Sequence, residues 1–423
     1  MNRSLARCIV ESLRVAGPIE EPLARLRTFG ERDWQRTLDW LHLSGLALLF
    51  WNHLQDQGCA GAVPPEVAER LTANLADNRL RTAEMAREFD ELNHQLHNAG
   101  IPYAVLKGFA LAPDFCPDAS LRNFTDYDYL VPSNCLERAR ETLQTMGYSQ
   151  KPGSDSYSVT YYQPSHPPYR VSRIEDIYSV ELAREVELHF KVWDEDQRIA
   201  LSLPNDFLAR STLRRWDQLC FPALRDEDVL IFNALHVFRH ILPHWCRVAG
   251  LLEIAHFTER RSSDAAFWDR FRHRILPYPR LSQIIGVIFS LAVGVFGVSL
   301  PGSIRACTTE TLSPVMAMWV ERYGLNLALG NFSGNKFSLF LHREFVRDAN
   351  AWKDIRRRQL FLLKKPARVA GNSKSLRARW AQLVYSMQLL KFHVPATIQY
   401  ALELPRWKRM VHRTSGCGLT SPR

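Results

Sequence analysis

The sequence predicts an α+β protein in which a small mixed β-sheet is surrounded by N- and C-terminal helices. Three observations lead to this fold class. Residues 101–148 read as a strand, a turn with a short helix, a second strand and a second helix. Another short strand is expected at 185–190, and apolar residues recur at helical spacing on both sides of these segments. With 423 residues, 46% of them hydrophobic, the chain is long enough to bury a core of this size.

The first 98 residues are expected to form an N-terminal helical region. Apolar residues at helical spacing over 34–53 predict one helix, and Pro64-Pro65 opens the next. Residues 65–98 then read as long amphipathic helices. Their expected buried positions are Leu71, Leu75, Met85, Phe89, Leu92 and Leu96.

Residues 99–203 are expected to carry the sheet. Ile101–Leu106 reads as a buried strand that ends in a Lys-Gly turn, and Phe124–Val131 reads as a second apolar strand. Ser133 is a plausible N-cap for the helix that follows. Residues 204–355 are again mainly helical by pattern and are expected to pack on this core.

Two aspartates interrupt the second strand. Asp126 and Asp128 are one residue apart, so both carboxylates point to the same face, about 6.5 Å apart along the strand. Like charges held this close on a half-buried strand repel each other. A divalent cation would relieve that repulsion, because Mg²⁺ prefers carboxylate oxygens, water and substrate phosphates. The pattern therefore predicts a metal site suited to phosphoryl chemistry.

Three segments, GIPYAVLKGFAL, LRNFTDYDYLVP and ARETLQTMGY, resemble the uncharacterised bacterial nucleotidyltransferases of the DNA-polymerase-β-like superfamily. The shared features are a Leu-Lys-Gly turn, an arginine before Asp-x-Asp-x-Leu-Val, and Gly-Tyr after the next helix. Arg122 occupies the place of that arginine. The later segments VELHF, RDEDVLIFNALHVFRHILPHW and Trp268-Asp269 are also similar, so the resemblance extends from about Asp33 to about Pro301.

The resemblance implies two Mg²⁺ ions, with Mn²⁺ as the alternative, held between the aspartate pair and a third carboxylate. Glu187 is the best candidate because it shares one face of a short strand with His189. It could also act as a general base toward the acceptor. Glu185 lies on the same face and is its nearest rival. The alternative for Glu187 is a surface position paired with Arg184.

Lys107, Gly108 and Arg122 are the expected nucleotide-binding residues. A glycine allows the backbone to approach phosphates closely, and a helix N-terminus after it would favour anions. Lys107 adds a point charge for the β- or γ-phosphate. Arg122 could pair with phosphate or with either aspartate, and the sequence leaves these open.

His236, His240 and His244 recur every four residues and so share one stripe of a helix. A zinc site has little support, because the His-Glu-x-x-His pattern is missing and Pro243 should break the helix. We favour packing or hydrogen bonding for His236 and His240. A substrate contact by this helix or by Arg247 is the alternative.

Composition predicts a cytoplasmic protein without a transmembrane span. The eight cysteines form no Cys-x-x-Cys pair, which argues against a zinc cluster or a disulfide framework. Arg3, Arg7 and Glu11 interrupt any apolar core of a signal peptide. Ile284–Leu300 is uncharged, but its 17 residues are at the lower limit for a membrane span. We expect it to be a buried core helix.

Residues 356–423 form a basic C-terminal extension. They contain 15 Lys and Arg residues against one acidic residue, Glu403, whereas residues 1–355 carry a net charge of −4. A linker, KKPARVAGNSKSLRARW, is expected before two amphipathic stretches, 380–394 and 396–410. Such a segment could bind an anionic membrane surface, placing the protein at the membrane periphery, or nucleic acid. A solvated tail or a helix pair packed on the core is the alternative.

Three function classes follow. The first is a nucleotidyltransferase that moves a nucleoside monophosphate from a nucleoside triphosphate, with ATP as the expected donor, to a small molecule or peptide. Pyrophosphate is released in this reaction. The second is an RNA-directed nucleotidyltransferase that uses the basic extension. The third is a non-catalytic binding protein on the same fold, which the mutually repelling carboxylates argue against.

Overall fold

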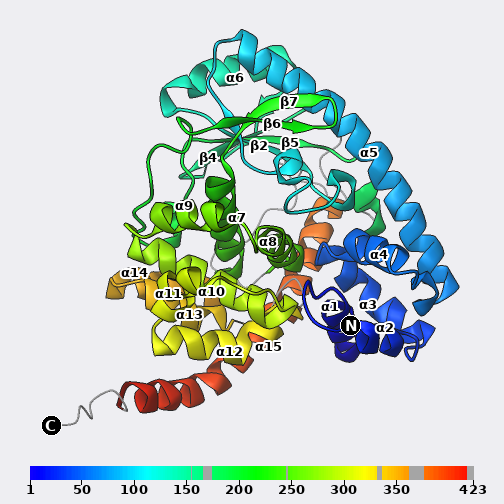
Figure 1. The fold of residues 1–423 in the computed structure, drawn as a ribbon, viewed down its shortest axis with the longest axis vertical. Helices are drawn as coiled ribbons and strands as arrows, with labels where there is room; N and C mark the ends of the chain where they lie inside the picture. The colour runs from blue at the N-terminus through cyan, green and yellow to red at the C-terminus, as the bar shows by residue number, and fades with distance from the viewer. Residues whose placement is uncertain (154, 165–173, 244–245, 331–335, 362–375, 417–423) are drawn as a thin grey trace.

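The computed structural model describes residues 1–153, 155–164, 174–243, 246–330, 336–361 and 376–416. It confirms the predicted α+β class, because a mixed sheet is surrounded by helices (Figure 1). The α-helices described are α1 (Arg3–Ser12), α2 (Glu20–Leu26), α3 (Glu31–Leu43), α4 (Ala47–Asp56), α5 (Pro65–Asn98), α6 (Leu136–Thr145), α7 (Asp226–Ile241), α8 (Val248–Arg260), α9 (Ala265–Ile275), α10 (Pro279–Phe296), α11 (Gly302–Cys307), α12 (Pro314–Ala328), α13 (Ser338–Phe345), α14 (Ala349–Leu360) and α15 (Leu376–Gly416).

Within the described residues, seven strands form the sheet in the order β3-β4-β5-β2-β1-β7-β6. The pairs β2–β5 and β1–β7 are parallel, and the remaining neighbours are antiparallel. The bounds are β1 (Ala104–Val105), β2 (Asp126–Leu130), β3 (Ser149–Gln150), β4 (Ser158–Tyr162), β5 (Glu185–His189), β6 (Thr212–Trp216) and β7 (Leu219–Ala223).

The two faces of the sheet differ because successive strand residues point to opposite sides. Tyr127 and Tyr129 of β2 join an apolar cluster with residues of α5 and α6, and both tyrosine rings lie against Phe89 of α5. The opposite face lies toward α7, where the rings of His189 and Phe232 are 6.0 Å apart. The charged residues of β2 and β5 are on this second face.

Helix α5 connects the N-terminal helices to the sheet along one side of the molecule (Figure 1). The amphipathic helices predicted over 65–98 are one continuous helix of 34 residues. All six residues that were expected to be buried along it are at most 4% exposed. The chain turns after the helix at Gly100, which has a φ of +64° that residues with a Cβ rarely adopt.

Helix α10 lies in the helical layer below the sheet and packs against α7, α8 and α12. It is the one helix in the described part of the chain that is long and apolar enough to cross a membrane, and most of it is buried within the protein. Gly286 lies against the backbone that follows α11 (Gly302–Cys307): a Cβ there would be 2.6 Å from the carbonyl oxygen of Thr308. These contacts agree with the expected core helix.

The sheet and the C-terminal extension differ in detail from the predicted organisation. The boundary expected at residue 203 divides the sheet, because β6 and β7 follow it and β7 pairs with β1. The two stretches expected after the linker form one helix, α15, with Pro395 and Pro405 inside it. Most of the predicted linker is outside the described residues.

We expect buried His42 of α3 to make the folded protein less stable as the pH falls. Its Nδ1 lies 3.0 Å from the Tyr178 hydroxyl, and burial, aided by Arg70, lowers the pKa of His42 to about 4. The unfolded chain takes up this proton below about pH 6.5, so stability is lost as pH falls from there toward the folded pKa. At about 1.4 kcal/mol per pH unit, the loss from this residue reaches about 3 kcal/mol.

We therefore expect the free energy of unfolding of a His42→Gln variant to fall less between neutral pH and about pH 5 than that of the wild type. Urea unfolding at both pH values measures this difference. His97, which is exposed on α5, provides the matched control as His97→Gln. An equal pH dependence in wild type and His42→Gln would contradict the assignment.

Candidate active site and metal cluster

The acidic residues of β2 and β5 are brought together by the register of these two parallel strands. Asp128 lies opposite Glu187, and Asp126 lies opposite Glu185. Neighbouring strands are about 4.8 Å apart, so side chains at paired positions on one face come within contact distance. Two carboxylate-bearing segments almost 60 residues apart in the sequence therefore meet on the face of the sheet toward α7.

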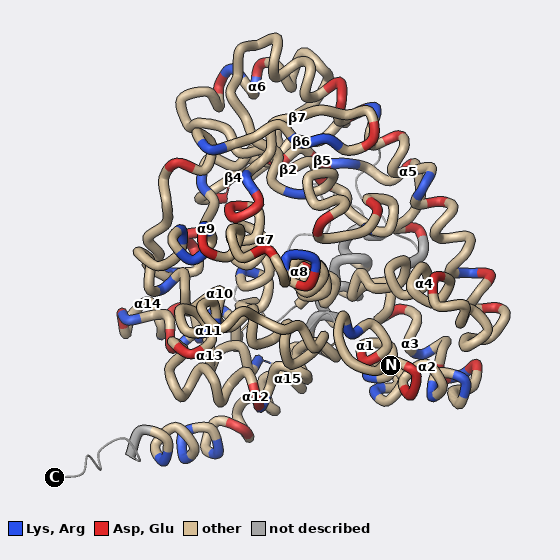
Figure 2. The backbone as a smooth tube through the Cα atoms, in the orientation of Figure 1, with Lys and Arg blue, Asp and Glu red and all other residues tan. Residues whose placement is uncertain are grey.

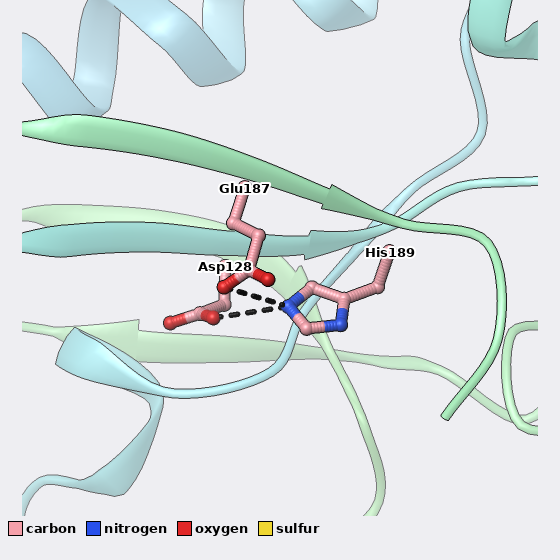
Figure 3. A group of neighbouring side chains, drawn as sticks. All are labelled: Asp128, Glu187 and His189. Atoms are coloured by element: carbon pink, nitrogen blue, oxygen red, sulfur yellow. Dashed lines mark hydrogen bonds and ion pairs between the residues drawn. The ribbon is translucent and has the colours of Figure 1, made fainter. Parts of the chain in front are cut away.

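Asp128, Glu187 and His189 form a compact cluster (Figure 3). His189 Nε2 lies 3.1 Å from Asp128 Oδ1 and 3.4 Å from Glu187 Oε2. The Ser158 hydroxyl of β4 donates to Glu187 Oε1 over 2.6 Å. Asp128 and His189 are at most 2% exposed, so these contacts fix both side chains within the protein.

The Lys107 ammonium lies between the two aspartates. Its Nζ is 3.1 Å from Asp128 Oδ1 and 3.8 Å from Asp126 Oδ2. Lys107 is 8% exposed, whereas the Asp126 side chain is 37% exposed and faces solvent. The sequence predicted that a metal relieves the repulsion between the aspartates. The Lys107 side chain already offsets part of this repulsion.

The pKa values of the cluster reflect competition between burial and pairing. Burial alone would lower the pKa of Lys107, but Asp128, Asp126 and Glu187 together raise it above its ordinary value. The pKa of Asp128 is raised, because burial and the charge of Asp126 outweigh Lys107 and His189. Burial would raise the pKa of Glu187, yet His189, Lys107 and Ser158 lower it well below its usual range.

The same contacts favour the charged form of His189. Burial would lower its pKa, but the hydrogen bonds to Asp128 and Glu187 raise it. With Nε2 protonated, the ring donates to both carboxylates and fixes their relative position. His189 thus serves as a positioning residue for the two carboxylates that the sequence predicted as metal ligands.

The cluster fits a divalent cation by its chemistry. One ligand atom from each of Asp128, Glu187 and His189 lies within 4.8 Å of the others. Among the described residues Asp128 Oδ2 is buried without a hydrogen-bond partner, which is costly for a carboxylate oxygen unless a cation or donor contacts it. Asp126 adds a solvent-facing carboxylate on the same face. The oxygens available are those that Mg²⁺ or Mn²⁺ prefers.

Glu185, the rival carboxylate, and Arg184, the alternative partner of Glu187, both pair with other residues. Glu185 forms an ion pair of 2.8 Å with Lys151 on the exposed edge of the sheet. Arg184 pairs with Glu88 of α5 over 3.2 Å. Glu187 therefore remains the carboxylate that lies beside Asp128, and it is not paired with Arg184 among the described contacts.

Gly108 has the backbone conformation that the Lys-Gly turn predicts. Its φ is +64°, and a Cβ there would be 3.4 Å from the ring of Phe124. The helix expected after it is a single 3-10 turn, Gly108–Leu111, followed by a cis peptide bond before Pro113. One short turn has little dipole, so the positive charge at this end of the site comes from the Lys107 side chain.

Helix α7 contributes His236, Arg239 and His240 beside the cluster. The two histidine rings contact each other, Nε2 to Nε2, at 3.2 Å. Burial first, then neighbouring cations, lowers the pKa of His236 well below its ordinary value and that of His240 to about 3, so both rings are neutral. This agrees with the hydrogen-bonding role favoured from the sequence, while His244 is outside the described residues.

Arg239 is a cation of this site that the sequence reasoning missed. Its guanidinium lies 4.6 Å from the centre of the Tyr157 ring and 3.3 Å from His236 Nδ1. Arg239 is near enough to Lys107 for its positive charge to act against the raised pKa of Lys107. The signal was present, because Arg239 lies between the two histidines in HVFRH, on a helix expected to cover the site.

Arg122 and Arg247 form a second cationic group next to Asp126. Arg122 pairs with Glu253 of α8, with Nε 2.7 Å from Oε1, rather than with either aspartate. Arg247 donates to the carbonyl oxygen of Asn123. Burial and the charge of Arg122 lower the pKa of Arg247, and Glu253 and Asp126 oppose this shift. Arg122 Nη1 is buried and has no hydrogen-bond partner among the residues that the structure describes, and the phosphate contact expected of Arg122 remains a prediction.

Together, the mixed sheet and the carboxylate–histidine cluster place on one sheet face a group of side chains that could hold a metal ion. The family model described as an uncharacterised nucleotidyltransferase matches residues 30–297. The chain therefore belongs to this nucleotidyltransferase family, as the resemblance implied, and family membership supports transferase activity. No curated protein matches the chain significantly.

The Arg122–Glu253 pair predicts a large effect on stability. The two side chains are 11% and 7% exposed, so Glu253→Gln removes the paired carboxylate of buried Arg122. We expect a loss of about 3–5 kcal/mol in chemical denaturation, because breaking a buried pair leaves an uncompensated charge.

Glu259→Gln, a half-buried position on the same helix, is the matched control and should change stability by less than about 0.5 kcal/mol. Equal stabilities of the two variants would show that Glu253 does not compensate the arginines.

Proposed function

We propose that the protein is a Mg²⁺-dependent nucleotidyltransferase, with Mn²⁺ able to replace Mg²⁺. It transfers a nucleoside monophosphate from a nucleoside triphosphate, with ATP as the expected donor, to a small molecule or peptide. The observation that carries the proposal is the convergence of Asp126, Asp128 and Glu187 on one sheet face in a member of a nucleotidyltransferase family. Three carboxylates on a sheet are the ligand set that such chemistry requires.

Asp126, Asp128 and Glu187 would hold the metal. When bound, the ion would neutralise charge on the triphosphate and lower the pKa of the acceptor group. Glu187 is better suited to ligation than to general-base catalysis, because the lowered pKa makes it a weak base. His189 and Ser158 hold its two oxygens in place by hydrogen bonds.

Lys107 and Arg239 supply the positive charge for the phosphates. Lys107 lies at the aspartates and Arg239 enters from α7 on the side of Glu187 and Tyr157. A triphosphate placed between these two elements would meet an ammonium and a guanidinium, and a guanidinium can bind two phosphate oxygens at once. The Tyr157 ring lies 4.6 Å from the Arg239 guanidinium and stabilises its position by a cation–π contact.

The reaction forms one bond and breaks one bond. An acceptor oxygen or nitrogen attacks the α-phosphorus while the bond from that phosphorus to the bridging oxygen breaks. The pyrophosphate leaves with the electron pair, and the acceptor loses its proton to solvent or to a carboxylate. The cations that contact the β- and γ-phosphates stabilise the charge that develops on this leaving group.

A non-catalytic role has one observation in its favour. The Lys107 ammonium partly neutralises Asp126 and Asp128, so the aspartates can be retained without a metal. The unpartnered Oδ2 of buried Asp128 weighs against this role, because Lys107 leaves that atom unsatisfied. Nucleotide binding separates the two roles experimentally.

Thermal stability with each nucleoside triphosphate, with and without Mg²⁺, tests the proposal. We expect a Mg²⁺-dependent rise in the Tm of the wild type for at least the preferred nucleotide, because a ligand that binds only the folded state stabilises it. Asp126→Asn and Asp128→Asn should fold but lose this rise and the release of pyrophosphate.

Asp269→Asn, at an exposed position of α9, is the control and should behave as the wild type. A rise in Tm that survives in Asp128→Asn would contradict the assignment of the nucleotide site. No rise with any nucleotide in the wild type would favour the non-catalytic role.

Replacement of Arg239 should weaken nucleotide binding. We expect Arg239→Met to raise the Kd for the preferred nucleotide about ten-fold or more, because a charge-assisted hydrogen bond to phosphate is lost. Calorimetric titration with Mg²⁺ present measures the change, and Arg87→Met, an exposed position on α5, serves as control. A Kd equal to that of the control would remove Arg239 from the nucleotide site.

A further inference from the structure

Helix α15 carries a row of exposed apolar side chains along one stripe. They recur every three or four residues, which is the spacing of a single helix face. Each is between 49% and 76% exposed, whereas most residues of these types in the protein are buried. The row consists of Trp380, Leu383, Met387, Leu390, Val394, Ile398 and Leu402.

The same helix is attached to the protein through other positions. The rings of Tyr400 and Trp407 stack on Phe340 of α13 at 5.0 Å, and both residues are nearly buried. Glu403 pairs with Arg322 of α12 over 2.7 Å. The helix is therefore apolar both where it packs on the protein and along its exposed row, and a helix with two apolar faces is typically covered on both.

Exposed basic residues accompany the apolar row. Lys391 lies within it, and Figure 2 shows further Lys and Arg residues along the end of α15 that extends away from the rest of the protein. The one acidic residue of the extension, Glu403, is already paired with Arg322. The exposed cations at that end are Arg406, Lys408, Arg409 and Arg413.

Charge and chemistry distinguish the possible occupants of this surface. A second copy of the chain would bring an identical set of cations to the interface, and these like charges would repel. A nucleic acid would attract the cations but gains little from leucine, methionine, valine and isoleucine, which neither stack on bases nor hydrogen-bond. An anionic lipid surface accepts apolar side chains below its headgroups and pairs with cations at them.

We propose that the exposed row of α15 binds the surface of an anionic membrane and makes the protein a peripheral membrane protein. The apolar side chains enter the boundary between headgroups and acyl chains, and the flanking Lys and Arg side chains contact the lipid phosphates. The attachment of α15 to α12 and α13 then holds the body of the enzyme at the membrane. This proposal is independent of the nucleotidyltransferase reaction.

Flotation of the full-length protein with vesicles tests the proposal. We expect binding to vesicles of phosphatidylcholine with about one-third phosphatidylserine, and at least about ten-fold weaker binding to phosphatidylcholine alone. Binding should weaken as salt is raised, because the flanking charges are exposed and screened. Equal binding to both vesicle types, or binding to neither, would overturn the proposal.

Two variants separate the apolar and the charged contributions. Met387→Glu/Leu390→Glu should lower vesicle affinity about ten-fold or more, and so should Lys408→Glu/Arg409→Glu. Leu80→Glu/Leu213→Glu changes two leucines that are 63% and 74% exposed on α5 and β6, and it should bind vesicles as the wild type does. Equal vesicle affinities of the first variant and this control would overturn the proposal.

The other occupants give different results. A concentration-dependent dimer that Met387→Glu/Leu390→Glu dissociates would assign the row to a second copy and overturn the membrane assignment. RNA binding that is lost in Lys408→Glu/Arg409→Glu but kept in Met387→Glu/Leu390→Glu would also overturn it. The changed positions are exposed, so we expect each variant to keep its helical structure. Circular dichroism of each variant checks this.

Discussion

The parallel pairing of β2 with β5 is the constraint on which the site depends. This register sets Asp128 beside Glu187, on a face that the helices also bury. Carboxylates collected in this way cannot remain uncompensated. Three side chains contact and compensate them: Lys107 from the turn after β1, His189 from β5 and Ser158 from β4. A shift of one residue in the β2–β5 register would turn the acidic residues of one strand toward the apolar cluster of α5 and α6.

The compensation is incomplete in a way that points to function. In the described part of the chain Asp128 Oδ2 has no hydrogen-bond partner, Asp126 faces solvent, and Arg239 approaches the cluster from α7. A purely structural ion network would close these gaps, because a buried unsatisfied carboxylate oxygen is costly. The site instead combines acidic groups for a cation with two basic groups for an anion. That combination matches a metal–nucleotide complex better than it matches either partner alone.

Much of the fold and the centre of the site could be predicted from sequence. Periodicity located α5 and its buried face, and the alternation around Asp126 and Asp128 showed that both share a face. Periodicity could not reveal which carboxylate lies opposite Asp128, since strand register depends on contacts distant in sequence. The family resemblance led to Glu187 as the third carboxylate. The partner of Arg122 was also inaccessible, because Glu253 is 131 residues away and on another helix. β6 and β7 were missed because β6 carries Arg214 and Arg215 and β7 includes Pro222, which is unusual within a strand.

We expect the β2–β5 carboxylates to bind a divalent cation in competition with the Lys107 ammonium. Electron paramagnetic resonance with Mn²⁺ alone, on the full chain, measures that affinity most directly. Lys107→Met should bind Mn²⁺ more tightly than the wild type, because a competing cation is removed, and Asp128→Asn should lose Mn²⁺ binding. The same Mn²⁺ affinity in all three proteins would contradict it and place the metal, if any, elsewhere.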